Sequence, residues 1–381
     1  MDFEFTEEQK IVVASLRSFA TEELLPKYAH WDRTGEFPAE IWQKMGAMGL
    51  LGLRVPEAYG GQALDCVTAG LAIEEVARGD FNCCYGILNS SFAGDLLGKY
   101  AAPEIQAAWL PAMASGDKVV CICLTEPHCG SDAASIRARA LRRGDHYVLN
   151  GEKSAITLLM AGDAGIVFAK TAPEAGAKGV SAFLVPLDLP GITRLPYADM
   201  GAKGIVRGSL FLEDVEIPAG NLIGPENGAF SRVMQTFEYT RGLIGLMCIG
   251  AAQVTLEETI TYTKDRTAFG QPISKNQGVS FPIAEWFTRL TMARWHCYRT
   301  LWLRDQGLPH NSEAAMCKGF IPEICMGTIQ DCMVLHGHYG YTQDFPVEQR
   351  LRDVAGQLIA DGTPQIQKLI IARGLFGRDF V

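Results

Sequence analysis

The apolar residues of this 381-residue chain change their period twice, and the order of these changes limits the fold more than any other feature. They recur at helical spacing up to about residue 117, form short alternating runs from 118, and return to helical spacing after the turn at 224–228. The sequence therefore predicts an α+β protein of three domains: an N-terminal all-α domain at 1–117, a middle β-barrel or sandwich domain at 118–225, and a C-terminal helical bundle at 226–381.

Individual elements follow from the same periods and from their flanking residues. Thr6 and Gln9 form a capping box that starts the first helix, and Pro26 is expected to lie beyond its end. The other expected helices cover residues 39–48, 66–77, 103–115, 229–266, 281–306, 311–335 and 365–373. The expected strands cover residues 119–124, 136–141, 146–149, 166–169, 180–186 and 209–217.

The charge pattern excludes several function classes. The net charge is −9, and no block rich in Lys and Arg occurs, which argues against nucleic-acid binding and against a polybasic membrane anchor. The start of the chain lacks the features of a signal peptide, and the apolar stretch 242–254 is too short to span a bilayer. No GxGxxG follows a strand, so a Rossmann fold is disfavoured. We expect a cytoplasmic protein without a membrane partner.

The eleven cysteines are expected to be reduced and mostly buried. One group invites a metal assignment: Cys121, Cys123, His128 and Cys129. Its spacing matches none of the familiar zinc patterns and no second ligand pair is nearby, so we expect no metal.

Asp361 is the acid that stands out near the C-terminus. Thr363 is a candidate N-cap and Pro364 suits the first position of the helix that follows, so Asp361 is expected at the mouth of a helix. A carboxylate fixed there has the chemistry to remove a proton from a substrate. From this segment alone, an Asp that favours the helix dipole from a solvated loop is an equally physical interpretation.

A second candidate segment is 125–132, where a strand ends in a Pro/Gly turn that carries Thr125 and Ser131. Hydroxyls and free backbone N–H groups in such a turn suit a planar polar ring or a phosphate. A simple turn closing a hairpin has the same pattern, so both interpretations are open at this point.

Six segments together resemble the acyl-CoA dehydrogenases, in the same order and over essentially the whole chain. They are 125–132, 150–153, 155–157, 266–270, Gln277 and 360–365. The resemblance implies FAD as cofactor, a C-terminal four-helix bundle, an acyl-CoA or acyl-carrier-protein thioester as substrate, and electron-transfer flavoprotein as electron acceptor. It also implies a homodimer or homotetramer, because the family shares each FAD between two subunits.

The resemblance assigns roles to individual positions. In the family the base is a Glu followed by Gly-Thr, or a Glu immediately before the position of Arg241; here Asp361 occupies the first place and Thr240 the second, so Asp361 is the implied catalytic residue. The implied substrate contacts are Ser131, Glu238, Arg241 and Gly362, although a solvated helix residue is an equal alternative for Glu238. The implied FAD contacts are Ile122, Leu124, Thr125, Gly130, Ser131, Ala155, Thr157, Arg266, Phe269, Gln277, Val334, Gly337, His338, Thr363 and Gln365, of which Arg266, Phe269 and Gln277 would serve the neighbouring subunit.

The sequence also departs from the family pattern. The base is an Asp, shorter than Glu by about 1.5 Å, and Ala155 and Ala360 stand where the family usually has Trp and Tyr. These changes free space near the reacting atoms and favour a branched or alicyclic acyl group. Val334 and His338 replace a Gln and a Gly, which either weakens FAD binding or gives it a new contact.

Two other functions are compatible with the same residues. One is a flavin oxidase of the nitroalkane type, which resembles this pattern with Asp as the base and needs no CoA. The other is a flavoprotein scaffold that has lost turnover, which the altered positions would explain. The chain ends without the extra helical domain and address signal of peroxisomal-type acyl oxidases.

Overall fold

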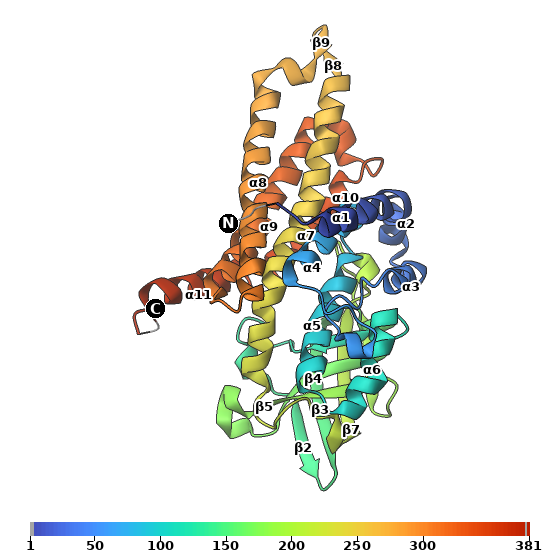
Figure 1. Ribbon diagram of the computed structural model, residues 1–381, viewed down its shortest axis with the longest axis vertical. Coiled ribbons are helices and arrows are strands. Elements are labelled where there is room, and N and C mark those ends of the chain that lie inside the picture. The colour runs from blue at the N-terminus through green and yellow to red at the C-terminus, as the bar shows by residue number, and fades with distance from the viewer. Residues whose placement is uncertain (1–3, 378) are drawn as a thin grey trace.

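The computed structural model describes residues 4–377 and 379–381. Figure 1 shows an elongated molecule in which long helices run from the β8–β9 tip at one end towards the β-sheet at the other, with the N-terminal helices packed on their side. The predicted order of helices, strands and helices is confirmed.

The N-terminal helices begin as predicted but continue further. The capping box of Thr6 and Gln9 starts α1 (Glu7–Phe19). The expectation that Pro26 lies beyond the helix is wrong, because a π-helical turn leads into α2 (Leu25–Thr34), where Pro26 occupies the first turn and its missing N–H costs no hydrogen bond. The remaining helices of this region are α3 (Ala39–Ala47), α4 (Cys66–Gly79), α5 (Cys84–Tyr100) and α6 (Pro103–Ser115).

Helix α5 was not predicted, and its burial explains why. Most of its residues from Cys84 to Leu97 are buried, so no polar face marks the helical period. It packs against α6, α4, β1 and α7 and therefore joins all three parts of the chain.

The middle region forms one seven-stranded sheet in the order β1-β4-β2-β3-β7-β6, with β5 paired to β4. All six predicted strands are present, and the exposed strand β6 is the addition. The longest strand, β3, runs to Ile156 and contains two register shifts against β7, the second between Lys153 and Ile156. The bounds are β1 (Val120–Cys123), β2 (Arg139–Arg143), β3 (His146–Ile156), β4 (Ala164–Lys170), β5 (Val180–Pro186), β6 (Ile192–Pro196) and β7 (Gly208–Pro218).

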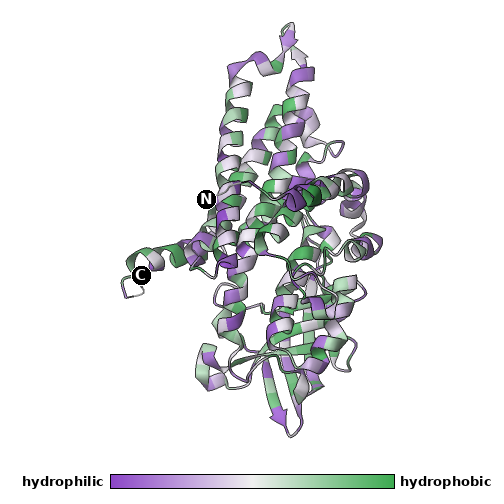
Figure 2. Ribbon diagram, viewed as in Figure 1, coloured by the Kyte–Doolittle hydropathy of each residue, from purple (hydrophilic) through white to green (hydrophobic). Residues whose placement is uncertain are grey.

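The long helices α7, α8 and α9 pack on one another in the C-terminal region, with α10 and α11 against α9, and α11 projects sideways with the C-terminus (Figure 1). The bounds are α7 (Ala229–Asp265), α8 (Gln277–Asp305), α9 (Asn311–Leu335), α10 (Val347–Ala355) and α11 (Pro364–Phe376), with β8 (Thr267–Ala268) and β9 (Gln271–Pro272) at the tip between α7 and α8. By length and composition α7 is apolar enough to cross a membrane, and Figure 2 shows its apolar middle. However, 72% of that window is buried inside the protein, as expected for the central helix of a bundle.

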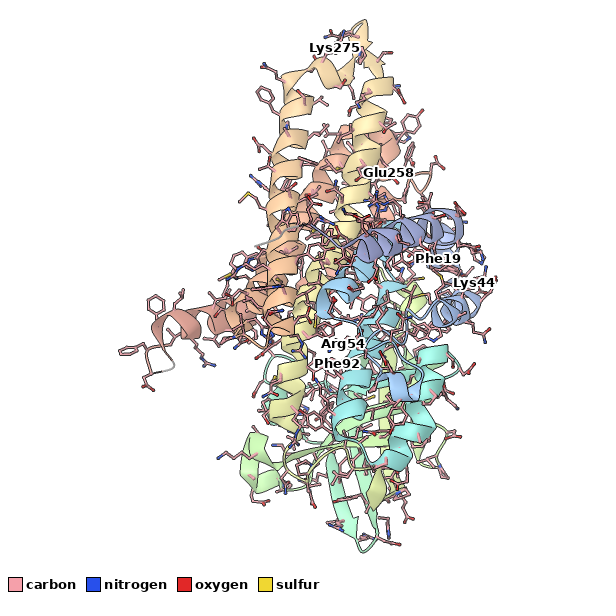
Figure 3. The ribbon with its side chains drawn as sticks, viewed as in Figure 1. Phe19, Lys44, Arg54, Phe92, Glu258 and Lys275 are labelled. Atoms are coloured by element: carbon pink, nitrogen blue, oxygen red, sulfur yellow. The ribbon has the colours of Figure 1, made fainter. Side chains whose placement is uncertain are left out.

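Charged and aromatic contacts join α5 to the bundle. Asp95 on α5 accepts hydrogen bonds from Arg54 at 3.3 Å and from Arg304 of α8 at 3.1 Å. Phe92 packs edge-on against Phe237 of α7, with ring centroids 5.1 Å apart. Figure 3 places Arg54 and Phe92 close together in this region. The N-terminal helices are therefore fixed on the bundle that carries the candidate site.

A buried ion pair fixes the segment that follows β1. Lys153 Nζ on β3 donates to Glu126 Oε1 at 2.7 Å and to the Leu124 carbonyl at 3.0 Å, and both side chains are buried. Glu126 also accepts the backbone N–H groups of Arg137 and Ala138 at 2.6 and 3.0 Å. The carboxylate thus holds together three segments around residues 124–138.

We predict that Lys153→Met lowers the free energy of unfolding by about 3–5 kcal/mol, because it leaves the Glu126 carboxylate buried without its cation. The matched control is Lys118→Met, whose exposed pair with Asp163 at 3.2 Å is expected to contribute about 1 kcal/mol or less. Urea unfolding of both variants measures the difference; equal losses would contradict the account.

Candidate active site

Asp361 lies in a turn of unusual backbone conformation between a 3₁₀ turn (Gly356–Leu358) and α11. Asp361 has φ 51° and Gly362 has φ 90°. A Cβ at Gly362 would come within 2.6 Å of Gln367 Nε2, so this position needs glycine on two grounds. Pro364 is at the start of α11 as predicted, and Thr363 is at the N-cap, but the Thr363 side chain makes no capping hydrogen bond. The turn is therefore held by contacts from other segments.

Two buried side chains supply those contacts. Lys318 on α9 donates its Nζ to the carbonyl oxygens of Gln357 at 2.5 Å and Gly362 at 3.3 Å. Gln367 donates its Nε2 to the carbonyls of Gly362 at 3.2 Å and Asp361 at 3.4 Å. Lys318, Gln357 and Gln367 are all fully buried. None of the three was predicted; the available signal was Lys318 as the one charged residue in the stretch 314–322 of α9.

Burial and two cations act in opposite directions on Asp361. Burial raises the pKa of its carboxyl above the ordinary value of 3.8, and the charges of Lys318 and Arg241 lower it part of the way back. In turn, burial lowers the pKa of Lys318, and the charge of Asp361 opposes that shift. The carboxylate is thus a stronger base than an exposed Asp, while the cations favour its ionised form.

Arg241 comes from α7 and is also buried. Its Nη1 donates to Asn311 at 3.4 Å, and its Nε has no hydrogen-bond partner in the described part of the chain. Burial lowers the pKa of Arg241, and the charges of Glu238 and Asp361 oppose this. Glu238 is half-buried, and the hydroxyl of Thr240 bonds the Phe237 carbonyl at 3.3 Å. Asp361 is therefore the carboxylate whose charge acts on both buried cations.

The predicted flavin-binding positions of the sheet lie together where β1 and β3 end. The Ser154 N–H donates to the Thr125 carbonyl at 2.9 Å, which places Thr125 beside the segment that holds Ala155 and Thr157. Ala155 has φ 56°, and its N–H donates to the Tyr197 hydroxyl at 3.2 Å. Among the predicted positions in β1 and the turn after it, Ile122 is partly buried and Leu124 is buried, whereas Gly130 and Ser131 are exposed.

The side chains of this edge fit a polar cofactor. Neither the Thr125 hydroxyl nor the Thr157 hydroxyl makes a hydrogen bond within residues 4–377 and 379–381. Both are therefore left to bind a ring or phosphate, as the resemblance implies for FAD.

Polar side chains connect this edge to the Asp361 turn. Arg207 forms a two-point ion pair with Asp199 at 2.8 and 2.6 Å, its carbonyl accepts the Tyr197 N–H at 2.9 Å, and its charge acts on Tyr85. Tyr85 of α5 accepts a hydrogen bond from Gln357 Nε2 at 2.6 Å. Because Gln357 belongs to the segment that carries Asp361, these contacts connect the end of the sheet to the Asp361 turn.

Thr363 and Gln365 lie beside Asp361 at the start of α11, whereas the other six predicted cofactor positions lie far from this site. Arg266 ends α7 twenty-five residues beyond Arg241, about 37 Å along a helix. Val334 follows Lys318 by sixteen residues on α9, about 24 Å. The tip group of Arg266, Phe269 and Gln277 is exposed, and so are Val334, Gly337 and His338; Figure 3 shows Lys275 of the same tip at the far end of the molecule. A cleft of about 720 Å³ also borders Arg266, and Asp361 does not line it.

The cysteine and histidine group takes a different form from the one considered in the sequence. Glu126, His128 and Cys129 place their ligand atoms within 4.8 Å of one another. The Glu126 carboxylate is already bonded to Lys153 and to two backbone N–H groups, while Cys121 and Cys123 are buried in β1. The buried Lys153–Glu126 ion pair described above therefore accounts for the position of the Glu126 carboxylate in this group.

Comparison with known proteins agrees with this arrangement. The sequence matches the acyl-CoA dehydrogenase N-terminal domain over residues 6–117, the middle domain over 121–215 and the C-terminal domain over 227–376. It is 38% identical to the probable acyl-CoA dehydrogenase YngJ of Bacillus subtilis, over 98% of this chain and 100% of that protein. The chain belongs to the acyl-CoA dehydrogenase family. It is therefore an FAD-dependent oxidoreductase that dehydrogenates acyl thioesters.

Two solved structures show how closely the acyl-CoA dehydrogenase fold is kept. Butyryl-CoA dehydrogenase from Megasphaera elsdenii superposes with a TM-score of 0.95 at 28% identity, covering 98% of this chain and 100% of that one. The prolyl acyl carrier protein oxidase AnaB superposes with a TM-score of 0.94 at 29% identity, with the same coverage. The α+β architecture predicted from the sequence is thus confirmed.

We predict that Lys318→Met moves the acid limb of activity to higher pH. Protonation of the base ends activity as pH falls, and removing a cation that lowers the pKa of Asp361 lets that pKa rise further above 3.8. The measurement is the pH dependence of flavin reduction by substrate. The control is Lys368→Met, an exposed lysine of α11. An acid limb that stays in place in the Lys318 variant would contradict the assigned electrostatics.

Proposed function

We propose that the protein dehydrogenates the α,β bond of a branched or alicyclic acyl thioester, with Asp361 removing the α proton. The observation that supports this most is the half-buried carboxylate in a fixed turn, whose pKa burial raises and which Lys318 and Arg241 flank. Burial makes it basic and the cations keep it ionised, which are the two properties that a carbon-acid base needs near neutral pH.

The same turn also supplies a donor for the substrate. An α proton of a thioester is too weakly acidic for a free carboxylate, so the developing charge on the thioester oxygen must be stabilised. The Asp361 N–H makes no hydrogen bond to the described residues and is available to bind that oxygen. FAD, when bound, accepts the β hydride. In this scheme Thr125 and Thr157 hold and orient the ring, and Gly362 and Thr363 keep Asp361 in place.

We base the proposed shape of the acyl group on the small side chains near Asp361. Ala155 and Ala360 are small, and the Asp361 side chain is shorter than that of the family's Glu by about 1.5 Å. A substrate must come closer to this base or be wider near its α carbon. A branched or ring-bearing acyl group satisfies both conditions. The thioester is carried by CoA or, as the name of AnaB indicates for that relative, by a carrier protein.

The position of the tip residues supports an oligomer. Because Arg266, Phe269 and Gln277 lie so far from Thr125 and Asp361 in one chain, they contribute to FAD binding only in a neighbouring subunit. We therefore propose a homodimer or homotetramer in which the adenosine end of FAD contacts the neighbour's tip and its Val334, Gly337 and His338. We further propose a cytoplasmic location and electron-transfer flavoprotein as the electron acceptor, the usual one in this family.

We predict that Asp361→Asn retains FAD but abolishes anaerobic bleaching of the flavin by substrate, because the amide cannot accept the α proton. The variant should also be at least as stable as the wild type at neutral pH. The pKa of Asp361 is raised in the folded state, so stability falls as pH rises through that pKa, and the amide removes this loss. Absorbance and thermal unfolding measure the two effects. Bleaching at the wild-type rate would refute the role of Asp361.

We predict that branched and alicyclic acyl-CoA thioesters reduce the flavin with a higher kcat/KM than straight-chain thioesters of the same carbon number. Ala360→Tyr should reverse the order by filling the space near the base. A wild-type preference for straight chains would contradict the proposed acyl class. Turnover of a nitroalkane with release of hydrogen peroxide, and no response to any thioester, would instead support the oxidase alternative.

A further inference from the structure

Tyr85 is a polar side chain at the site that the proposed mechanism does not use. It projects from α5, is only 7% exposed, and lies close enough to Asp361 for the charge of that carboxylate to act on it. Burying a phenol hydroxyl without a full set of hydrogen bonds is unfavourable, so the hydrogen bonds that Tyr85 makes and lacks indicate what it binds.

Gln357 determines the direction of the Tyr85 hydroxyl. The Gln357 Nε2 donates to the hydroxyl oxygen at 2.6 Å, so the single phenolic proton is left to donate elsewhere. The Tyr85 hydroxyl donates no hydrogen bond to the described residues, and Gln357 Oε1 is likewise buried without a partner. Tyr85 is therefore oriented as a hydrogen-bond donor, and its hydroxyl proton is unpaired within the described residues.

The charges nearby restrict what the donor binds. The Arg207 guanidinium is already matched by Asp199 through two hydrogen bonds, and Asp361 is itself an anion. Lys318 and Arg241 already face the Asp361 carboxylate, so a carboxylate on the substrate would compete with Asp361 for these cations and would be repelled by it. Burial, followed by the charge of Asp361, raises the pKa of Tyr85, so the phenol keeps its proton at working pH. The acceptor that fits is a neutral oxygen.

We propose that Tyr85 is a specificity-determining residue that donates a hydrogen bond to a neutral oxygen substituent, a hydroxyl or carbonyl group, on the acyl chain of the substrate. Gln357 is the positioning residue that orients the donor. The inference rests on the proposed thioester dehydrogenation and narrows its substrate to oxygenated acyl groups. Without such an oxygen, a hydrocarbon substrate leaves the Tyr85 proton unpaired in a dry site, which reduces binding.

The test compares pairs of acyl-CoA thioesters that differ only by a hydroxyl or a methyl group on the same carbon beyond the β position. In the wild-type holoenzyme the hydroxyl member of at least one pair should have a kcat/KM about tenfold higher or more. Tyr85→Phe should remove most of that ratio. Tyr147→Phe is the matched control: it removes a buried phenol hydroxyl bonded to Glu226 at 3.0 Å, near the opposite end of β3 from Ala155, and should retain the ratio.

Binding provides a second readout that does not depend on turnover. In holoenzyme carrying Asp361→Asn, calorimetry should show tighter binding of the same hydroxyl member, and adding Tyr85→Phe should abolish the difference. Three results would each overturn the inference. The kcat/KM ratio could survive in Tyr85→Phe, the methyl member could be preferred throughout, or Tyr85→Phe could lower kcat/KM equally for both members. If no thioester bleaches the wild-type flavin, the proposed dehydrogenation fails, and calorimetry still decides whether Tyr85 selects an oxygen.

Discussion

The ammonium group of Lys318, buried beneath the turn of Asp361, is the interaction on which the site depends. It bonds two backbone carbonyls, at Gln357 and Gly362, and thereby fixes the chain before and after Asp361. A cation in such a place loses its hydration, and the carbonyls together with the Asp361 carboxylate replace it. Lys318 therefore contributes both to the position of Asp361 and to its charge, together with Gln367 and Arg241.

The architecture explains how this arrangement is assembled. The long helices α7 and α9 bring Arg241 and Lys318 from distant parts of the chain to one level of the bundle, while α11 begins there and carries the turn. The sheet contributes a second border through Thr125 and Ala155, and α5 contributes a third through Tyr85. The tip of α7 and α8 extends far from this level, which is why the proposed FAD contacts at the tip require a neighbouring subunit.

The sequence predicted the parts of the structure that depend on local patterns. The three-part order, the capping box at Thr6 and the start of α11 at Pro364 all follow from periodicity and from the chemistry of helix ends. Asp361 became the leading candidate only through resemblance, because an Asp before a helix has an ordinary local explanation. Helix α5 was missed since burial on all sides erases its period, and Pro26 was misread since a proline in a first turn resembles one after a last turn. Lys318, Gln357 and Tyr85 were missed because their roles arise from contacts between segments far apart in the sequence.

The most direct test of the account is exchange of the substrate's α proton with solvent. A thioester with sulfur at the β position has no β hydride to lose, so any loss of its α-proton NMR signal in heavy water reports proton removal alone. The account predicts exchange in the wild-type holoenzyme and none above the buffer rate in Asp361→Asn with FAD retained. Exchange at the wild-type rate in that variant would show that another group is the base and would contradict the central claim.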